Sequence, residues 1–412
     1  MTRRFSCVSR ADDSGVVSDL FWPGAERADP LLSDAAFLDA MVAVEQAWLD
    51  ALVDAGVAPA GAELPGQLGP DDLPALARAA EAGGNPAQPV VTLLRERSGC
   101  AWVHRGLTSQ DVVDTALALC LRDIAARLCA ELRSQMTSLA DLADTHRDSL
   151  MAGRTLTQHA VPTTFGRKAA GWLDGVLAAA GRLDDLALPA QLGGAAGTLS
   201  AVVEMAGSVD AASVIVGTAS RRLGLEPSEP WHTSRAPVTA AADALVACTD
   251  AWGRIATDIT TLARPEIAEL AERSPGGSST MPHKQNPVLS VLLRRAALTA
   301  PPLAAILHAA AAIAGDERPD GAWHAEWATL RDLGRRTVVA ASHATEILGG
   351  LRVDAARMAA TARAHWDELT AERDAIAQFA DFPSRNGDYL GASDRIIDSA
   401  LGRARTFLEE DQ

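Results

Sequence analysis

The chain has 412 residues, of which 48% are hydrophobic and 22% charged, proportions typical of a folded protein of two or three structural units. Its formal net charge of −16 argues against a nucleic-acid partner, because such binding depends on phosphate neutralisation by lysine and arginine. Aromatic residues make up only 4% of the chain, and alanine is abundant. This composition favours helices over strands, so the predicted fold class is all-α. A small anionic substrate is not excluded, since a few cations in a cleft make a local positive field.

Nothing in the sequence predicts a disulfide framework, a metal site or an organic cofactor. The cysteines are odd in number and none form a CxxC pair; they are Cys7, Cys100, Cys120, Cys129 and Cys248. The first residues, Met1 to Asp19, contain no apolar segment of the kind found in secretory signals. No stretch reaches the roughly 18 uninterrupted apolar residues of a membrane span. The predicted location is therefore the cytoplasm.

Apolar residues recur at helical spacing along most of the chain. Ser33 is placed to cap a helix that runs through Trp48, and the Gly- and Pro-rich segment Glu81–Pro89 is predicted to be a loop. Val112–Leu150 contains neither glycine nor proline and predicts a helix roughly 50–60 Å long, at about 1.5 Å per residue. Further helices are predicted at Thr164–Leu188, Thr239–Leu270, Pro287–Ala314, Glu326–Leu348, Asp354–Ala377 and Asp394–Leu408.

Helices of this length cannot bury their apolar stripes on short neighbours, so a long bundle shared between subunits is expected. Three parts are predicted: an N-terminal helical domain (1–105), a central long-helix bundle (106–348) and a small C-terminal helical domain (349–412). Polar and Gly-rich breaks interrupt the bundle at His104–Asp111, Gly153–Thr164, Gly193–Gly197, Pro230–Arg235 and Ser274–Asn286.

The most informative break is the segment 274–287, which reads SPGGSSTMPHKQNP. Two glycines and two serines predict a mobile loop, and Pro287 suits the first position of a following helix. Helix N-termini favour anions, Lys284 adds a positive charge, and Asn286 can donate to a carboxylate. A serine in such a field loses its proton more easily than usual, which suits a general base.

From Gly277 to Asn286 this run resembles the signature loop of the fumarase/aspartase superfamily, GSSxMPxKxN. The resemblance implies that Ser278 removes a proton from the substrate carbon and that Lys284 and Asn286 hold a substrate carboxylate. Ser279 and Met281 belong to the same motif and are candidate substrate contacts. It further implies a three-part fold whose central helices form the core of a homotetramer, with active sites assembled from three subunits.

Two other breaks resemble the first and second signature regions of the superfamily. Thr108 and Ser109 can cap the long helix, and the resemblance implies that their hydroxyls bind substrate carboxylate. Ser109 is also a candidate general acid.

In the second region, Arg154, Thr155 and Gln158 are the implied substrate-binding residues. Leu156 stands where many members have a histidine that protonates the leaving group. His159 is either a replacement acid or a hydrogen-bonded structural residue, and the sequence leaves both open.

Four further runs resemble the 3-carboxy-cis,cis-muconate cycloisomerases of that superfamily, and the likeness extends from about Asp34 to Leu408. The runs are Gln191–Thr198, Pro230–Arg235, Gly321–Trp327 and Tyr389–Ala392. Arg235 is a candidate carboxylate clamp, since a guanidinium binds a carboxylate bidentately. The chain departs from that subgroup at Arg264–Ile267, at Ala236-Pro237, at Gln285 and at Gly315–Pro319.

Because these departures surround the predicted pocket, the sequence favours a changed substrate on a retained catalytic core. The predicted activity is a lyase that eliminates a group β to a carboxylate through a carbanion, such as nitrite from nitrosuccinate with release of fumarate. The alternative is the cycloisomerase reaction, with the same carbanion chemistry. A catalytically inactive assembly protein is disfavoured because Ser278, Lys284 and Asn286 are all present.

Overall fold

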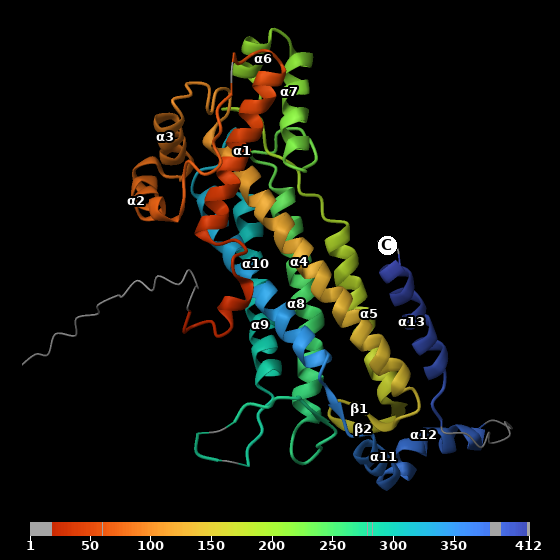
Figure 1. Cartoon of the computed structure of the whole chain (residues 1–412). Helices are drawn as coiled ribbons and strands as arrows, with labels where there is room; N and C mark the ends of the chain where they lie inside the picture. The colour runs from red at the N-terminus through yellow and green to blue at the C-terminus, as the bar shows by residue number, and fades with distance from the viewer. Residues whose placement is uncertain (1–18, 60, 278, 282, 380–388, 410–412) are drawn as a thin grey trace, which may run out of the picture.

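The computed structural model describes residues 19–59, 61–277, 279–281, 283–379 and 389–409. Within them the chain is mostly helical, as predicted, with two short antiparallel strand pairs (Figure 1). The α-helices are α1 (Asp34–Asp54), α2 (Leu73–Gly83), α3 (Ala87–Ser98), α4 (Ser109–Thr145), α5 (Phe165–Asp184), α6 (Ser200–Ala206), α7 (Val209–Arg222), α8 (Ala236–Leu262), α9 (Val288–Ala312), α10 (Gly321–Leu348), α11 (Ala355–Ala364), α12 (Trp366–Phe379) and α13 (Ser393–Glu409). The strands are β1 (Leu150–Thr155), β2 (Gln158–Thr164), β3 (Leu270–Ala271) and β4 (Arg352–Val353), and 3-10 turns lie at Ala25–Ala28 and Pro70–Asp72.

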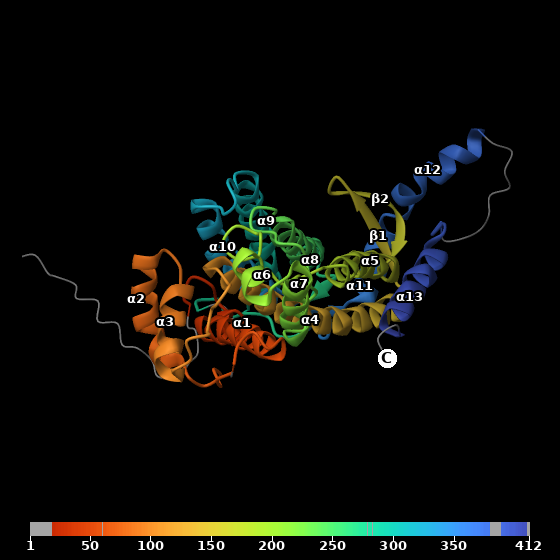
Figure 2. The same ribbon diagram turned by 90° about the horizontal axis from the view of Figure 1, so that it is seen from above.

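Five long helices, α4, α5, α8, α9 and α10, run along one axis and form a bundle (Figures 1 and 2). The apolar stripe predicted on the longest helix is buried there; its members Ile124, Leu128, Leu132, Met136 and Leu139 are inaccessible to solvent. With 37 residues, α4 is roughly 55 Å long at about 1.5 Å per residue. The predicted long-helix bundle is therefore confirmed within one chain.

The shorter elements collect at the two ends of this bundle. Helices α1, α2, α3, α6 and α7 lie toward the end where α4 begins, and the β1–β2 hairpin with α11 and α12 lies at the other (Figure 1). Helix α13 returns along the bundle and packs against α5 and α4. Segments far apart in sequence therefore meet at each end, while the bundle keeps the two ends apart.

Helix caps are largely where the sequence placed them. The Ser33 hydroxyl accepts a hydrogen bond from the Ala36 N–H at 3.1 Å, which confirms the predicted start of α1. The Thr164 hydroxyl accepts from the Arg167 N–H in the same way and begins α5. Thr108 is the N-cap residue of α4, as predicted.

Two expectations of local structure were wrong. The predicted loop Glu81–Pro89 is mostly helical, because α2 continues to Gly83 and α3 begins at Ala87. The predicted helix Asp354–Ala377 is two helices, broken at His365. The predicted break Gly153–Thr164 does interrupt the helices, and it contains most of an antiparallel hairpin whose tip is exposed.

A buried histidine on α10 gives the fold a pH-dependent stability. His343 is almost inaccessible, and burial, reinforced by the charges of Arg27 and Arg295, lowers its pKa to about 4. Because the unfolded chain binds a proton at this residue near pH 6.5, the unfolded state holds more protons than the folded state between pH 6.5 and 4. The stability contributed by neutral His343 is therefore full above pH 6.5 and is lost as the pH falls toward 4.

We predict that the free energy of unfolding falls by about 3 kcal/mol between pH 7 and pH 4 through His343 alone. In His343→Gln this part of the pH dependence should disappear, whereas it should persist in His308→Gln, which removes a half-exposed histidine. Urea unfolding at a series of pH values measures both. Identical pH profiles for wild type and His343→Gln would contradict the assignment.

Candidate active site

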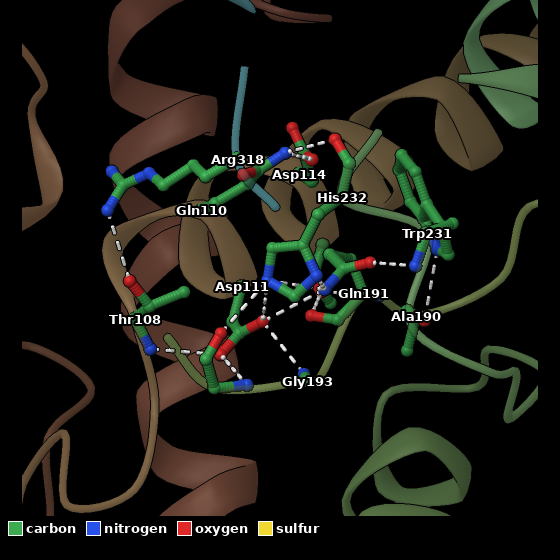
Figure 3. A network of polar contacts seen from close by, with 12 residues as sticks. Thr108, Gln110, Asp111, Asp114, Ala190, Gln191, Gly193, Trp231, His232 and Arg318 are labelled. Atoms are coloured by element: carbon green, nitrogen blue, oxygen red, sulfur yellow. Dashed lines mark hydrogen bonds and ion pairs between the residues drawn. The ribbon is translucent and has the colours of Figure 1, made fainter. Parts of the chain in front are cut away.

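The start of α4 is held by a buried carboxylate. Asp111, in the first turn, accepts hydrogen bonds from the backbone N–H groups of Thr108, Gly193 and Gly194 at 2.9 Å each, and from Gln191 Nε2 at 3.0 Å (Figure 3). Burial raises the pKa of Asp111, and these N–H donors oppose that shift. The carboxylate thus fixes the turn at Gly193–Gly194 against the beginning of α4.

Gln191 extends this network to the segment that precedes α8. Its Oε1 accepts from the Trp231 N–H at 2.6 Å, and its Nε2 lies 3.2 Å from His232 Nδ1. His232 Nε2 in turn lies 2.9 Å from the Gly194 carbonyl oxygen, and both His232 and Trp231 are buried (Figure 3). The runs 191–198 and 230–235, which stood out in the sequence, therefore meet at one end of the bundle, and Trp231 and His232 are packing residues.

Arg235 does not have the predicted geometry of a substrate clamp. Its guanidinium donates to Asp114 at 2.7 and 3.1 Å and to Glu326 at 3.0 and 2.5 Å, and none of its side chain is accessible. With two carboxylates already on one guanidinium, no donor faces a substrate. The prediction of a carboxylate clamp was therefore wrong: Arg235 is a buried structural cation that joins α4 to α10.

Sequence reasoning missed a cation at this end. Arg318 Nη1 donates to the Thr108 hydroxyl at 3.3 Å (Figure 3). Its guanidinium also lies over the Trp323 ring, 5.1 Å from the ring centroid. The Thr108 hydroxyl at the start of α4 therefore lies beside a cation. Arg318 lies in the run 315–319 that departs from the cycloisomerases, and that departure was the available signal.

The hairpin carries the second group of predicted residues at the opposite end of the bundle. Arg154 donates to Glu269 at 2.8 and 3.1 Å, whereas Thr155 and Gln158 are exposed. At the tip, Leu156 is 95% exposed, and Leu156 and Thr157 have φ of 48° and 70°. Non-glycine residues rarely adopt this conformation, and such outliers concentrate at functional sites.

His159 lies beside a second histidine. Its ring centroid is 4.4 Å from that of His365, which lies between α11 and α12, and His365 Nδ1 is 3.2 Å from Glu368 Oε2. Partial burial, reinforced by His365 and Arg154, lowers the pKa of His159. The lowered pKa reduces the protonated fraction of His159 near neutral pH, and both interpretations of this residue stay open.

These three side chains also bear on the expectation of no metal site. Ligand atoms of His159, His365 and Glu368 lie within 4.8 Å of one another, which is close enough for the three side chains to hold one metal ion. This cluster could not be predicted from the sequence, because His365 and Glu368 are about 200 residues from His159 along the chain.

The signature loop is closed at its base by backbone pairing. Gly276 and Asn286 exchange two N–H···O bonds of 2.9 Å, and Asn286 Nδ2 donates to the Gly277 carbonyl at 3.3 Å. Between them, Ser279, Met281 and Lys284 are exposed. Ser278, the predicted base, lies outside the described residues.

The helix that follows the loop already has an anion at its N-terminus. Glu272 is buried, and its carboxylate accepts from the N–H of Ser290 at 2.8 Å, the hydroxyl of Ser290 at 2.7 Å and the N–H of Leu289 at 3.3 Å. The anion at this helix N-terminus is therefore Glu272, and the N–H groups of Leu289 and Ser290 are not free for a substrate. Pro287 is the N-cap residue and Val288 the first helical residue, one position later than predicted.

The predicted site residues are not brought together within one chain. Thr108 and Ser109 begin α4, whereas β1 starts at Leu150, just after α4 ends, so the rigid helix separates the two groups by roughly 55 Å at about 1.5 Å per residue. Arg154 is joined to Glu269, four residues before Arg273 and the loop, so the hairpin and the loop share one end.

Comparisons with known proteins agree with the fold and with the motifs. A family model described as lyase matches residues 90–300. A nitrosuccinate lyase of Streptomyces davaonensis is 44% identical over 381 residues, which are 88% of this chain and 79% of that protein. A 3-carboxy-cis,cis-muconate cycloisomerase of Bradyrhizobium diazoefficiens is 38% identical over 405 residues, 91% of this chain and 86% of that protein. The crystal structure of 3-carboxy-cis,cis-muconate lactonizing enzyme from Pseudomonas putida superposes with a TM-score of 0.79 at 30% identity, covering 92% of this chain and 97% of that one.

We predict that Arg235→Gln lowers the free energy of unfolding by about 3–5 kcal/mol, the range for breaking a buried ion pair, since Asp114 and Glu326 would keep buried charge without their cation. Urea unfolding followed by circular dichroism measures the loss. Arg78→Gln, at an exposed position on α2, is the matched control and should change stability little. A stable Arg235→Gln variant with only a raised KM would restore the clamp interpretation.

Proposed function

The chain belongs to the lyase family of the fumarase/aspartase superfamily, and from that premise we propose that it eliminates nitrite from nitrosuccinate and releases fumarate. The observation that carries the proposal is the 44% identity to a nitrosuccinate lyase across 88% of the chain. In this reaction a base removes a proton from the methylene carbon, the resulting carbanion forms the double bond, and the nitro group departs with its electron pair as nitrite.

Ser278 is the proposed base, and Lys284 and Asn286 are proposed to hold the carboxylate whose charge grows as the carbanion forms. Ser279 and Met281 would contact the substrate from the same loop. The exposed position of Lys284 supports this role, because its ammonium is available to a ligand. Thr108 and Ser109 would bind the other carboxylate, and Arg318 beside the Thr108 hydroxyl adds positive charge there.

We propose that departure of the leaving group needs little help from an acid. Nitrite is stable as an anion, so it can leave without a proton. Two observations support this: Leu156 occupies the position of the usual histidine, and partial burial lowers the pKa of His159, which reduces its protonated fraction. His159 and Ser109 remain the candidate donors if one is needed. Arg154, Thr155 and Gln158 would line the substrate from the hairpin.

We further propose that the active site is shared between subunits of a homotetramer. The separation of Thr108 from the loop by the length of α4 supports sharing, because one chain cannot place both groups on one small dicarboxylate. Helix α9 supports assembly: one side packs against α8 and α10, while Val291, Leu298 and Ile306 are exposed. By length and composition α9 also qualifies as a candidate membrane span, and we assign its apolar surface to contacts between copies.

The proposed division into residues 1–105, 106–348 and 349–412 follows from the same arrangement. The central part contains α4 to α10, and the flanking parts contain α1 to α3 and α11 to α13. We propose that this enzyme works in the cytoplasm on a small dicarboxylate, with no metal or organic cofactor and no nucleic-acid or membrane partner.

The second candidate is 3-carboxy-cis,cis-muconate cycloisomerase. It is favoured by the 38% identity over 91% of the chain and by the superposition on the lactonizing enzyme. Both reactions form a carbanion next to a carboxylate, so the loop residues would have the same roles.

We predict that the purified enzyme converts nitrosuccinate to fumarate and nitrite, followed by ultraviolet absorbance, and leaves the chromophore of 3-carboxy-cis,cis-muconate unchanged. Ser278→Ala should lower kcat by at least ~100-fold, the usual scale for loss of a general base. Loss of the muconate chromophore alone would establish the cycloisomerase, and near-wild-type activity of Ser278→Ala would remove that residue from the role.

We predict that mixing two inactive variants restores activity if the site is shared. Thr108→Val and Lys284→Ala alter opposite ends of one chain, so a mixed tetramer contains some sites in which both segments are intact. The control mixture, Ser278→Ala with Lys284→Ala, alters the same segment and should stay inactive. Denaturing each pair together, refolding and measuring nitrite release makes the comparison. Equal inactivity of both mixtures would contradict sharing.

A further inference from the structure

A cavity of about 380 Å³ lies between the β1–β2 hairpin and helices α5 and α8. Its size falls in the range of small-molecule sites. Four cationic side chains line it, together with the single acidic side chain of Asp258; the cations are Arg154, Arg167, Lys168 and Arg254. In a chain with a net charge of −16, such a local excess of positive charge calls for an explanation.

The nearby carboxylates are already engaged by two of the four cations. Asp258 pairs with Lys168 at 3.3 Å and accepts from Trp172 Nε1 at 2.8 Å, and the buried Glu269 pairs with Arg154. Among the described residues, neither of the remaining cations, Arg167 and Arg254, has a carboxylate within ion-pair distance. The cavity therefore retains two uncompensated positive charges.

These two guanidinium groups converge on one point. Arg167 Nη1 and Arg254 Nη2 lie 3.3 and 3.4 Å from the position that a Cβ on Gly171 would occupy. Arg254 is held there by a 2.9 Å hydrogen bond from its Nη1 to the Gly171 carbonyl oxygen. Two like charges this close repel each other unless an anion lies between them. The missing side chain of Gly171 leaves the space in which both groups can approach.

We propose that this cavity binds a small dianion, a dicarboxylate or inorganic phosphate, between Arg167 and Arg254. Guanidinium groups present paired N–H donors that match the oxygens of carboxylates and phosphates. Two such groups on rigid helices select a doubly charged ligand over a monoanion. Arg154 and Thr155, close to the tip of the hairpin, line the same cavity. Recognition depends on charge and size, so this site does not rest on the elimination reaction.

Calorimetric titration of the full chain with succinate, with phosphate and with acetate tests the proposal. The titrations are made in a Lys284→Ala background, which weakens binding at the proposed catalytic loop. We expect succinate, phosphate or both to bind, and acetate to bind at least about tenfold more weakly, because it cannot engage both cations at once. Binding of succinate alone assigns the site to dicarboxylates, and binding of phosphate alone assigns it to phosphate.

Gly171→Ala is the most specific test of this site, because it changes no charge. The added methyl group would lie 3.3 Å from Arg167 Nη1 and 3.4 Å from Arg254 Nη2 and would take the space between them from an anion, so dianion binding should weaken by at least about tenfold, the scale of a lost charge-assisted hydrogen bond. The melting temperature should not fall, since alanine favours a helix interior over glycine. Arg167→Gln combined with Arg254→Gln should abolish binding, whereas Arg78→Gln, which removes an exposed charge on α2, should leave it unchanged.

Three outcomes would overturn the proposal. One is a dianion affinity that is the same in wild type, Gly171→Ala and the double arginine variant. Another is an equal loss in Arg78→Gln, which would reduce the effect to overall charge. The third is an absence of dianion binding combined with dissociation of the double arginine variant in analytical ultracentrifugation, which would show that a carboxylate from another copy occupies the cavity.

Discussion

Two buried carboxylates in the first turns of α4 hold one end of the molecule together. Asp111 accepts hydrogen bonds from N–H groups at the start of its own helix and at the turn Gly193–Gly194. Asp114 and Glu326 of α10 both form ion pairs with Arg235. Buried charge is tolerated only where it is fully paired, so each carboxylate fixes the segments that supply its donors. The position of the Thr108 hydroxyl, and of Arg318 beside it, follows from this arrangement.

Because α4 is rigid, one chain keeps its two groups of candidate site residues apart, and the proposed assembly would bring them together. A rigid helix of 37 residues keeps the hydroxyls at its start away from the loop and the hairpin at the other end. In the proposed assembly, antiparallel packing of copies would bring opposite ends together, and the exposed apolar residues of α9 would be a surface for it. In such a design, the long helices carry stability and the breaks between them carry chemistry, which is why the sequence patterns of the two are so different.

The sequence predicted the features that depend on local or periodic signals. Apolar spacing gave the long helices, and Ser33 gave the start of α1. The sequence predictions were wrong where the role of a residue depends on a contact with a residue far away in the chain. The sequence predicts a carboxylate clamp at Arg235, whereas its guanidinium binds Asp114 and Glu326, which are 121 and 91 residues away. Likewise, the occupant of the α9 N-terminus is Glu272, on the far side of the loop. The hairpin was missed because its tip has left-handed residues that are neither glycine nor asparagine.

The carboxylate of Glu272 also narrows the proposed mechanism. Because it accepts hydrogen bonds from the N–H groups of Leu289 and Ser290, these two groups at the start of α9 are not available to the charge of a developing carbanion. Lys284 and Asn286 are the groups that the loop offers, and the pairing of Gly276 with Asn286 fixes where that loop begins and ends. A lysine at an exposed position is strongly hydrated and attracts an anion weakly until water is excluded. Burial of the loop against a neighbouring subunit would supply that exclusion, so assembly and charge stabilisation become one requirement.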